Sequence, residues 1–170
     1  MEYDGLTDFI KAGRRHLADA RELLEMPTYR PSAPDAGHRH LRAAIYLAGY
    51  AVECALKAYI ISRTARCSSW REVLAYRSET GAAAPGLRGA ESHNLRRLAA
   101  VAGLLSGLQA DPPLRDQWMA CRKWDVNWRY HPQHFAGRSD ARDMVDAAVM
   151  IHDWVEDRRR YGDREDGKTP

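Results

Sequence analysis

The feature that most constrains this chain is a run of ten residues, 43–52, without a charged side chain. The run lies within residues 38–63, where apolar positions recur at alternating steps of four and three, the spacing of one helix face. These positions are Leu41, Ile45, Ala48, Val52, Leu56 and Tyr59. A helix that is apolar on every side is covered on more than one side. We therefore expect residues 38–63 to form a helix in the centre of a bundle or at a subunit interface.

The helical period recurs in four more long segments, over residues 6–25, 94–107, 113–130 and 139–161. A shorter helix is expected over residues 67–76. No segment shows the polar and apolar alternation, rich in Val, Ile and Thr, that is typical of strands. Pro27 stops the first helix, and Ser139 is the expected N-cap of the last. The sequence thus predicts an all-α protein, a four- or five-helix up-and-down bundle.

Length and composition predict one domain of ordinary globular type. The chain has 170 residues, of which 45% are hydrophobic and 29% are charged, and about 100–200 residues is the usual size of one domain. We expect a single helical domain over residues 1–162. Residues 163–170 mix charges of both signs densely and are expected to form a flexible tail.

The chain shows neither a membrane span nor a secretory signal. No uncharged apolar run reaches the roughly 18–20 residues that cross a bilayer, and the first residues lack a basic segment followed by an apolar one. The three cysteines, Cys54, Cys67 and Cys121, are too widely spaced for a disulfide framework or a metal knuckle. We expect a cytoplasmic protein without a cofactor. We also expect no catalytic metal, because His131 and His134 lack a third ligand at suitable spacing.

The clearest candidate for chemistry is the pair Arg129 and His134, separated by four residues at the end of the predicted helix 113–130. A guanidinium binds phosphate oxygens with a planar fork of donors, and a histidine that titrates near neutral pH can move the proton of a ribose 2′-hydroxyl. The net charge of +3 permits a nucleic-acid partner. In the alternative interpretation Arg129 pairs with Asp125, four residues earlier on the helix, and His134 has no role.

Glu53 and Lys57 form a second candidate pair, one helical turn apart and directly after the uncharged run. An unpaired buried carboxylate is costly, so an enclosed Glu53 has to meet Lys57, Arg129 or a hydroxyl. In the alternative interpretation the two residues form an exposed ion pair without a role. Trp124 and Trp128, at helical spacing, are predicted to be core residues, with base stacking as the alternative.

Three segments taken together resemble the HEPN domain, a small helical domain of prokaryotic toxins, phage-defence proteins and RNA-processing enzymes. They are the Ala-x-Tyr-Leu-Ala-Gly-Tyr-x-x-Glu-x-x-Leu-Lys stretch ending at Lys57, the His-x-Leu that begins at His93, and the segment from Trp124 to Arg129 and Tyr130. The resemblance covers residues 38–161. It departs from the family at Tyr130, because a polar residue, often Asn, commonly follows the arginine.

The resemblance implies a HEPN-like bundle that dimerises, with two Arg-x4–6-His motifs forming one metal-independent endoribonuclease cleft. Arg129 and His134 match this motif as catalytic residues. The expected supporting residues are Glu53, Lys57, Asn127, Tyr130 and His131. We expect a homodimer formed around residues 38–63 and 113–130.

Two functions from different classes follow from these residues. The first is an endoribonuclease of a toxin–antitoxin or phage-defence system that binds RNA and leaves a 2′,3′-cyclic phosphate. The second is a catalytically inactive helical module that mediates protein, nucleotide or RNA binding, partnered with an antitoxin or a separately encoded nucleotidyltransferase.

Overall fold

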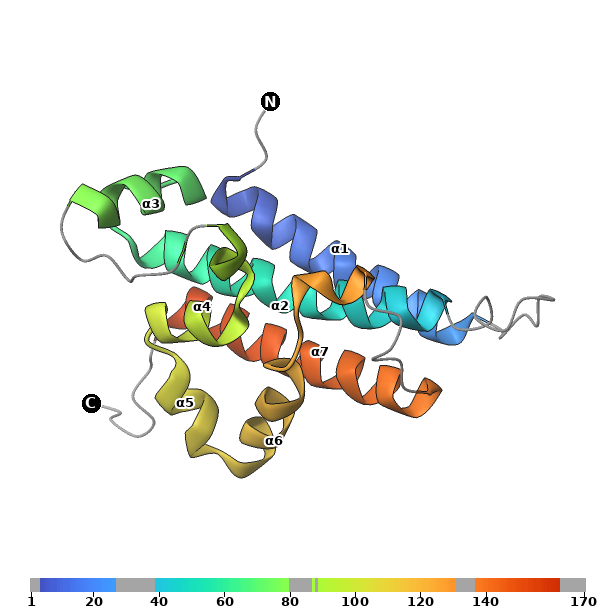
Figure 1. Cartoon of the computed structure of the whole chain (residues 1–170). Helices are drawn as coiled ribbons and strands as arrows, with labels where there is room; N and C mark the ends of the chain where they lie inside the picture. The colour runs from blue at the N-terminus through green and yellow to red at the C-terminus, as the bar shows by residue number, and fades with distance from the viewer. Residues whose placement is uncertain (1–3, 27–38, 80–86, 88, 131–136, 163–170) are drawn as a thin grey trace.

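The computed structural model describes residues 4–26, 39–79, 87, 89–130 and 137–162. Within these ranges the chain forms seven α-helices and two short 3₁₀-helices, and no strand, which confirms the all-α prediction (Figure 1). In chain order they are α1 (Leu6–Glu25), α2 (Arg39–Arg63), α3 (Trp70–Glu79), η2 (Gly89–His93), α4 (Leu95–Val101), α5 (Leu105–Ala110), α6 (Pro112–Cys121), η3 (Val126–Tyr130) and α7 (Arg138–Tyr161).

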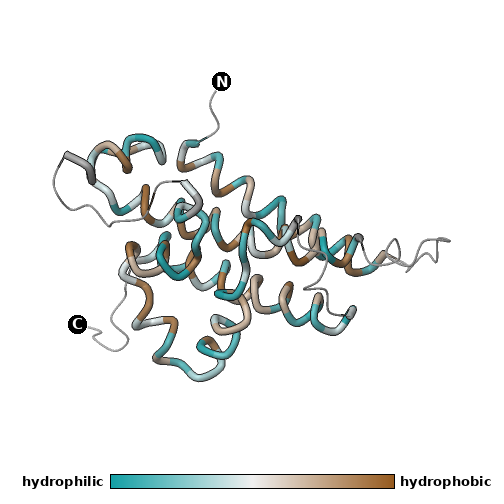
Figure 2. The backbone as a smooth tube through the Cα atoms, viewed as in Figure 1, coloured by the Kyte–Doolittle hydropathy of each residue, from teal (hydrophilic) through white to brown (hydrophobic). Residues whose placement is uncertain are grey.

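The three long helices α1, α2 and α7 lie side by side and form the body of the protein (Figure 1). Helix α2 runs opposite to α1 and in the same direction as α7. The chain returns between α2 and α7 through the short helices α4, α5 and α6, instead of through one long helix. Along α1, hydrophobic positions alternate with hydrophilic ones, as expected of a helix with one face in the core and one in solvent (Figure 2).

Helix α2 is the core helix. Within its uncharged run Ala44, Ala48, Ala51 and Val52 are completely buried, and every residue from 51 to 61 is buried. Helices α1 and α7 and the segment before η3 cover it from several sides. The apolar run is thus covered within one chain, and its composition does not by itself require a second subunit.

Helix α2 also passes a length and composition test for membrane spans, which no other helix in the described ranges passes. In the window concerned, within His40–Arg63, 83% of the residues are buried inside the protein. The hydropathy of α2 is therefore that of a bundle core.

The predicted helix over residues 94–107 is broken into α4 and α5. Gly103 has a φ of 72°, a left-handed conformation that a residue with a Cβ rarely adopts. Its N–H donates to Ala100 O at 3.0 Å, and the N–H of Leu104 donates to Ala99 O at 2.9 Å. These two bonds form a Schellman motif, which ends α4 and turns the chain into α5.

The predicted helix over residues 113–130 is also shorter than expected, because α6 ends at Cys121. The N–H of Trp124 donates to Cys121 O, and Asp125 Oδ1 accepts from the N–H of Asn127 at 2.7 Å. Asp125 therefore begins a separate short turn, η3. The described residues form seven α-helices instead of the predicted four or five, because α3 adds to the five long segments and the break at Gly103 divides one of them.

Helix α7 begins one residue earlier than expected, and its N-cap is Gly137 instead of Ser139. The first helical residue, Arg138, reaches back to the end of α1. Its guanidinium donates to the backbone oxygens of Leu24 and Met26. A cation at these last carbonyls of α1 also interacts favourably with the helix dipole, so the contact fixes the start of α7 against the end of α1.

Candidate functional site

Glu53 is a carboxylate inside the protein core, with only 1% of its side chain exposed. Lys57, one turn further along α2, donates from Nζ to Glu53 Oε1 at 2.7 Å and is itself 7% exposed. Burial removes the hydration of both charges, so at this spacing each charge is stabilised by the other. The enclosed Glu53–Lys57 pair that the sequence predicted is present, and the exposed alternative is wrong.

His93 is the second partner of Glu53, and the sequence-based site did not include it. Its Nδ1 lies 3.0 Å from both Glu53 Oε1 and Glu53 Oε2. His93 ends η2, and the next residue, Asn94, caps α4 by accepting the N–H of Arg97 at 3.1 Å. The cap fixes the backbone directly beside the ring. We call Glu53, Lys57 and His93 the Glu53 cluster.

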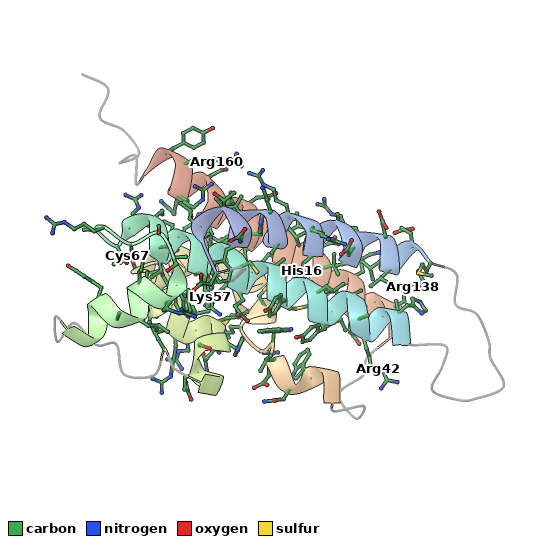
Figure 3. All side chains as sticks on the ribbon, turned by 90° about the horizontal axis from the view of Figure 1, so that it is seen from above. His16, Arg42, Lys57, Cys67, Arg138 and Arg160 are labelled. Carbon is green, nitrogen blue, oxygen red and sulfur yellow. The ribbon has the colours of Figure 1, made fainter. Side chains whose placement is uncertain are left out.

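The ammonium of Lys57, the side chain labelled in Figure 3, lies over two aromatic rings, 5.6 Å from the centroid of Phe9 and 5.2 Å from that of Trp70. Ring faces stabilise a desolvated cation. Phe9 belongs to α1 and Trp70 begins α3, whose first N–H donates to Asp4 O at 2.8 Å. The Glu53 cluster is thus the point where α1, α2, α3 and η2 meet.

Two thiols near the core are not candidates for nucleophilic chemistry. Burial is the main cause that raises the pKa of both Cys54 and Cys121 to about 12, and for Cys54 the charge of Glu53 contributes to this rise. The reactive form of cysteine is the thiolate. Both side chains are therefore protonated at neutral pH.

The segment that carries Arg129 is held against α2 by Trp124. This tryptophan is 3% exposed and lies against Gly49, with the rings of Tyr46 and Tyr50 at 5.9 and 6.4 Å between centroids. The prediction that Trp124 is a core residue is confirmed. Gly49 and Glu53 are four residues apart, so they lie on the same face of α2. The turn that carries Arg129 and the Glu53 cluster therefore share one face of this helix, which Figure 1 shows with η2 and η3 both over α2.

Of the predicted site residues, the structure brings Glu53 and Lys57 together, and it places Asn127 on the exposed surface of η3. Arg129 and Tyr130 are the last two residues of η3. The side chains of both, and all of His131 and His134, lie outside the described residues. The α-helix that the alternative Asp125–Arg129 pair required is absent, since η3 begins only at Val126.

The contact between Gly49 and Trp124 gives a stability test of this packing. A Cβ at position 49 would lie 2.2 Å from two atoms of the indole ring, so Gly49→Ala forces a buried tryptophan to move. We expect a loss of about 1–3 kcal/mol in the free energy of unfolding, although alanine is the better helix former. Urea denaturation measures this loss.

Gly107→Ala is the matched control. A Cβ at position 107 would lie 3.0 Å from Trp154, a half-buried side chain that has room to shift. We expect a smaller effect than at position 49. A Gly49→Ala midpoint equal to that of the wild type would contradict the close packing of Trp124 on α2.

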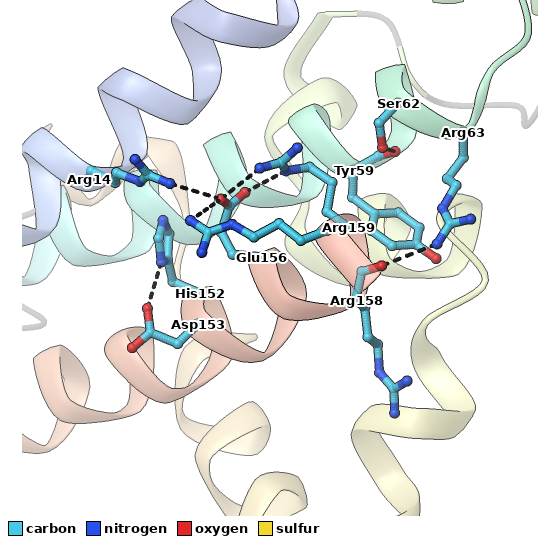
Figure 4. Close-up of polar contacts among 10 residues, drawn as sticks. Arg14, Tyr59, Ser62, Arg63, His152, Asp153, Glu156, Arg158 and Arg159 are labelled. Atoms are coloured by element: carbon cyan, nitrogen blue, oxygen red, sulfur yellow. Dashed lines mark hydrogen bonds and ion pairs between the residues drawn. The ribbon is translucent and has the colours of Figure 1, made fainter. Parts of the chain in front are cut away.

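A second buried carboxylate, Glu156 of α7, is paired with arginines (Figure 4). Arg159 donates from Nε and Nη2 at 2.9 and 3.0 Å, and Arg14 of α1 and Arg160 lie 3.6 Å away. Burial raises the pKa of Glu156, but the bonds and charge of Arg159, with His152 and Arg160, outweigh it and bring the pKa below its ordinary value. This group joins α1 to α7 and borders a cavity of about 430 Å³.

The described residues also bear on the metal prediction. Within them, no three His, Cys, Asp or Glu side chains are grouped so that they could hold a metal ion. The two histidines considered from the sequence, His131 and His134, lie outside those residues.

Comparisons of the chain with protein-family models, with curated proteins and with solved structures give no match.

Proposed function

We propose that this protein is a HEPN-type, metal-independent endoribonuclease that acts as a dimer, with Arg129 and His134 of each subunit in a shared cleft. The observation that carries the proposal is the position of three segments on α2. The stretch that contains Glu53 and Lys57, the turn that ends at His93 and the turn that contains Arg129 are far apart in the sequence. They meet on one face of one helix. These are the segments that resemble the HEPN domain.

The chemistry follows from the two side chains of the motif. Arg129 is charged at every physiological pH, so its role is electrostatic: its fork of N–H donors binds the phosphate and stabilises the charge that develops on it. His134 is the titrating group that transfers a proton. Attack of the ribose 2′-oxygen on phosphorus, with loss of the 5′-oxygen, leaves a 2′,3′-cyclic phosphate and needs no metal.

The dimer is proposed to form around α2 and the η3 segment, in a HEPN-like arrangement of the bundle. Although most of the uncharged run is buried within the chain, Tyr46, Leu47 and Tyr50 are only half-buried and leave apolar surface on α2. This surface adjoins the turn that carries Arg129, through Trp124. A two-fold contact here brings two copies of the motif together.

A second candidate function is a catalytically inactive HEPN module that binds a protein, a nucleotide or RNA. One observation favours it: the charge of Glu53 is satisfied within the chain by Lys57 and His93, as in a purely structural element. In this case the partner is an antitoxin or a nucleotidyltransferase.

Cleavage of total RNA in EDTA separates the two functions. We expect the wild-type protein, purified free of any antitoxin, to cut RNA with EDTA present throughout, and His134→Ala to lose about 10²–10⁴ in rate because a general acid or base is removed. The melting temperature of each preparation shows that it is folded.

Two results would contradict the nuclease function. One is intact RNA after incubation with the wild type, and the other is a His134→Ala variant that cuts as fast as the wild type. Sedimentation of the wild type as a monomer near 19.3 kDa at micromolar concentration would contradict the shared cleft.

A further inference from the structure

We propose that His93 is a general base of this site, held in its reactive tautomer by Glu53, whose charge is paired with that of Lys57. The inference rests on the proposed ribonuclease function and adds a residue to it. Neither the Arg-x4–6-His motif nor the predicted site includes His93.

The tautomer follows from the partners of the ring. An ionised carboxylate accepts hydrogen bonds and cannot donate them. Both oxygens of Glu53 lie 3.0 Å from Nδ1 of His93, so the hydrogen-bond network assigns the proton to Nδ1. In the neutral ring Nε2 then carries the lone pair, and 32% of the His93 side chain is exposed. A neutral imidazole with Nδ1 bound inward is a proton acceptor at Nε2, for which no hydrogen bond to a described residue is present.

The charged groups around the His93 ring stabilise the cation that forms when the ring takes up a proton. Proton uptake at Nε2 creates an imidazolium, which the adjacent carboxylate stabilises, as in the His–Asp pair of serine hydrolases. The carboxylate of Glu53 is 1% exposed, so its charge needs a buried counter-charge, and the ammonium of Lys57 lies 2.7 Å from it. On the turn that carries His93, Glu91 is paired with Arg97 at 2.5 Å.

Two contacts on α2 show how His93 is placed relative to the segment of the proposed cleft. Trp124 lies on Gly49 and His93 lies on Glu53, and these two α2 positions are one helical turn apart on the same face. One turn is a rise of about 5–6 Å along the helix. His93 and the tryptophan that leads to Arg129 thus pack on neighbouring turns of the same α2 face.

The step is a proton transfer coupled to phosphoryl transfer. Nε2 of His93 takes the proton of the ribose 2′-hydroxyl while the 2′-oxygen forms a bond to phosphorus. The bond from phosphorus to the 5′-oxygen breaks, and protonated His134 gives its proton to the leaving 5′-oxygen. The imidazolium of His93 then loses its proton to water and His134 takes one up, and the products are a 2′,3′-cyclic phosphate and a 5′-hydroxyl.

His93→Asn tests this role because it separates the bond to Glu53 from basicity. The amide of asparagine can donate to Glu53 from the position of Nδ1, but it cannot take up a proton at neutral pH. We expect His93→Asn to melt close to the wild type and to keep its KM for RNA. Its kcat should fall about 10²–10⁴-fold, and the acidic limb of the pH–kcat profile should disappear.

Two comparisons complete the experiment. His152→Asn on α7, where the ring Nδ1 also lies beside a carboxylate, 3.1 Å from Asp153 Oδ1, is the matched control and should cleave at the wild-type rate. Nitrogen NMR shifts of the His93 ring, measured without RNA, should show the proton on Nδ1.

The failures can be told apart. If His93→Asn keeps the wild-type kcat while His93→Ala loses stability, His93 only tethers η2 to α2, and the inference falls while the ribonuclease function stands. A proton found on Nε2 in the neutral ring overturns the inference in the same way. If the wild type does not cleave RNA, the proposed function fails and the inference fails with it.

Discussion

Glu53→Ala is expected to lower the free energy of unfolding by about 3–5 kcal/mol, the usual effect of removing one partner from a buried ion pair. The variant leaves the ammonium of Lys57, 7% exposed, without a counter-charge, and it leaves Nδ1 of His93 without its acceptor. Urea denaturation followed by circular dichroism measures the change. A loss below about 1 kcal/mol, the range of exposed ion pairs, would contradict the burial of this pair.

Glu91→Ala is the matched control for this prediction. Glu91 pairs with Arg97 at 2.5 Å, a shorter distance than that between Glu53 and Lys57, but both side chains are nearly half exposed. Exposed pairs contribute about 0–1 kcal/mol, so this variant should be close to the wild type. The comparison separates burial from distance as the source of the effect.

A double variant shows whether the Glu53–Lys57 pair serves stability or function. Replacement of a buried ion pair by apolar residues of similar volume is often neutral or stabilising. Glu53→Leu combined with Lys57→Met should therefore recover most of the stability that Glu53→Ala loses. If the pair holds His93 for catalysis, the double variant remains folded and cleaves RNA poorly.

The long helices could be predicted from the sequence because each is an uninterrupted amphipathic or apolar segment with a clear stop. The prediction for α1 agrees with the structure at both ends, and those for α2 and α7 differ by one residue at the start. The two predicted helices that failed were broken by local hydrogen bonds. The Schellman motif at Gly103 and the bond from Asn127 to Asp125 each compete with a helix that the apolar period alone would continue.

The candidate site could be predicted only where its residues are close in the sequence. Glu53 and Lys57 are four residues apart after an uncharged run, so their pairing follows from helix geometry. His93 is 40 residues from Glu53, and their contact depends on the path of the chain through α3 and η2. The signal available was a histidine directly before the N-cap Asn94. Burial of Glu156 was missed because it lies among the dense charges near the end of α7.

Arg129→Lys is expected to lower the rate of RNA cleavage about 10²–10³-fold, as removal of one donor to a developing anion does. Lysine keeps the positive charge, so long-range attraction of RNA persists and KM changes little. It lacks the planar fork that binds two phosphate oxygens at once, so stabilisation of the transition state is lost and the effect appears in kcat.

The control for this variant is Arg142→Lys on α7, an exposed arginine whose Nη2 lies 3.6 Å from Glu25 Oε1. It makes the same chemical change away from the proposed cleft and should cleave at the wild-type rate. Single-turnover cleavage of an oligoribonucleotide in EDTA gives kcat for both variants. If Arg129→Lys cleaves as fast as Arg142→Lys, only the charge at position 129 is used, and the planar fork of the guanidinium has no part in the transition state. If only Arg129→Lys is slow and both bind RNA equally, the guanidinium acts in the transition state, which an inactive module cannot explain.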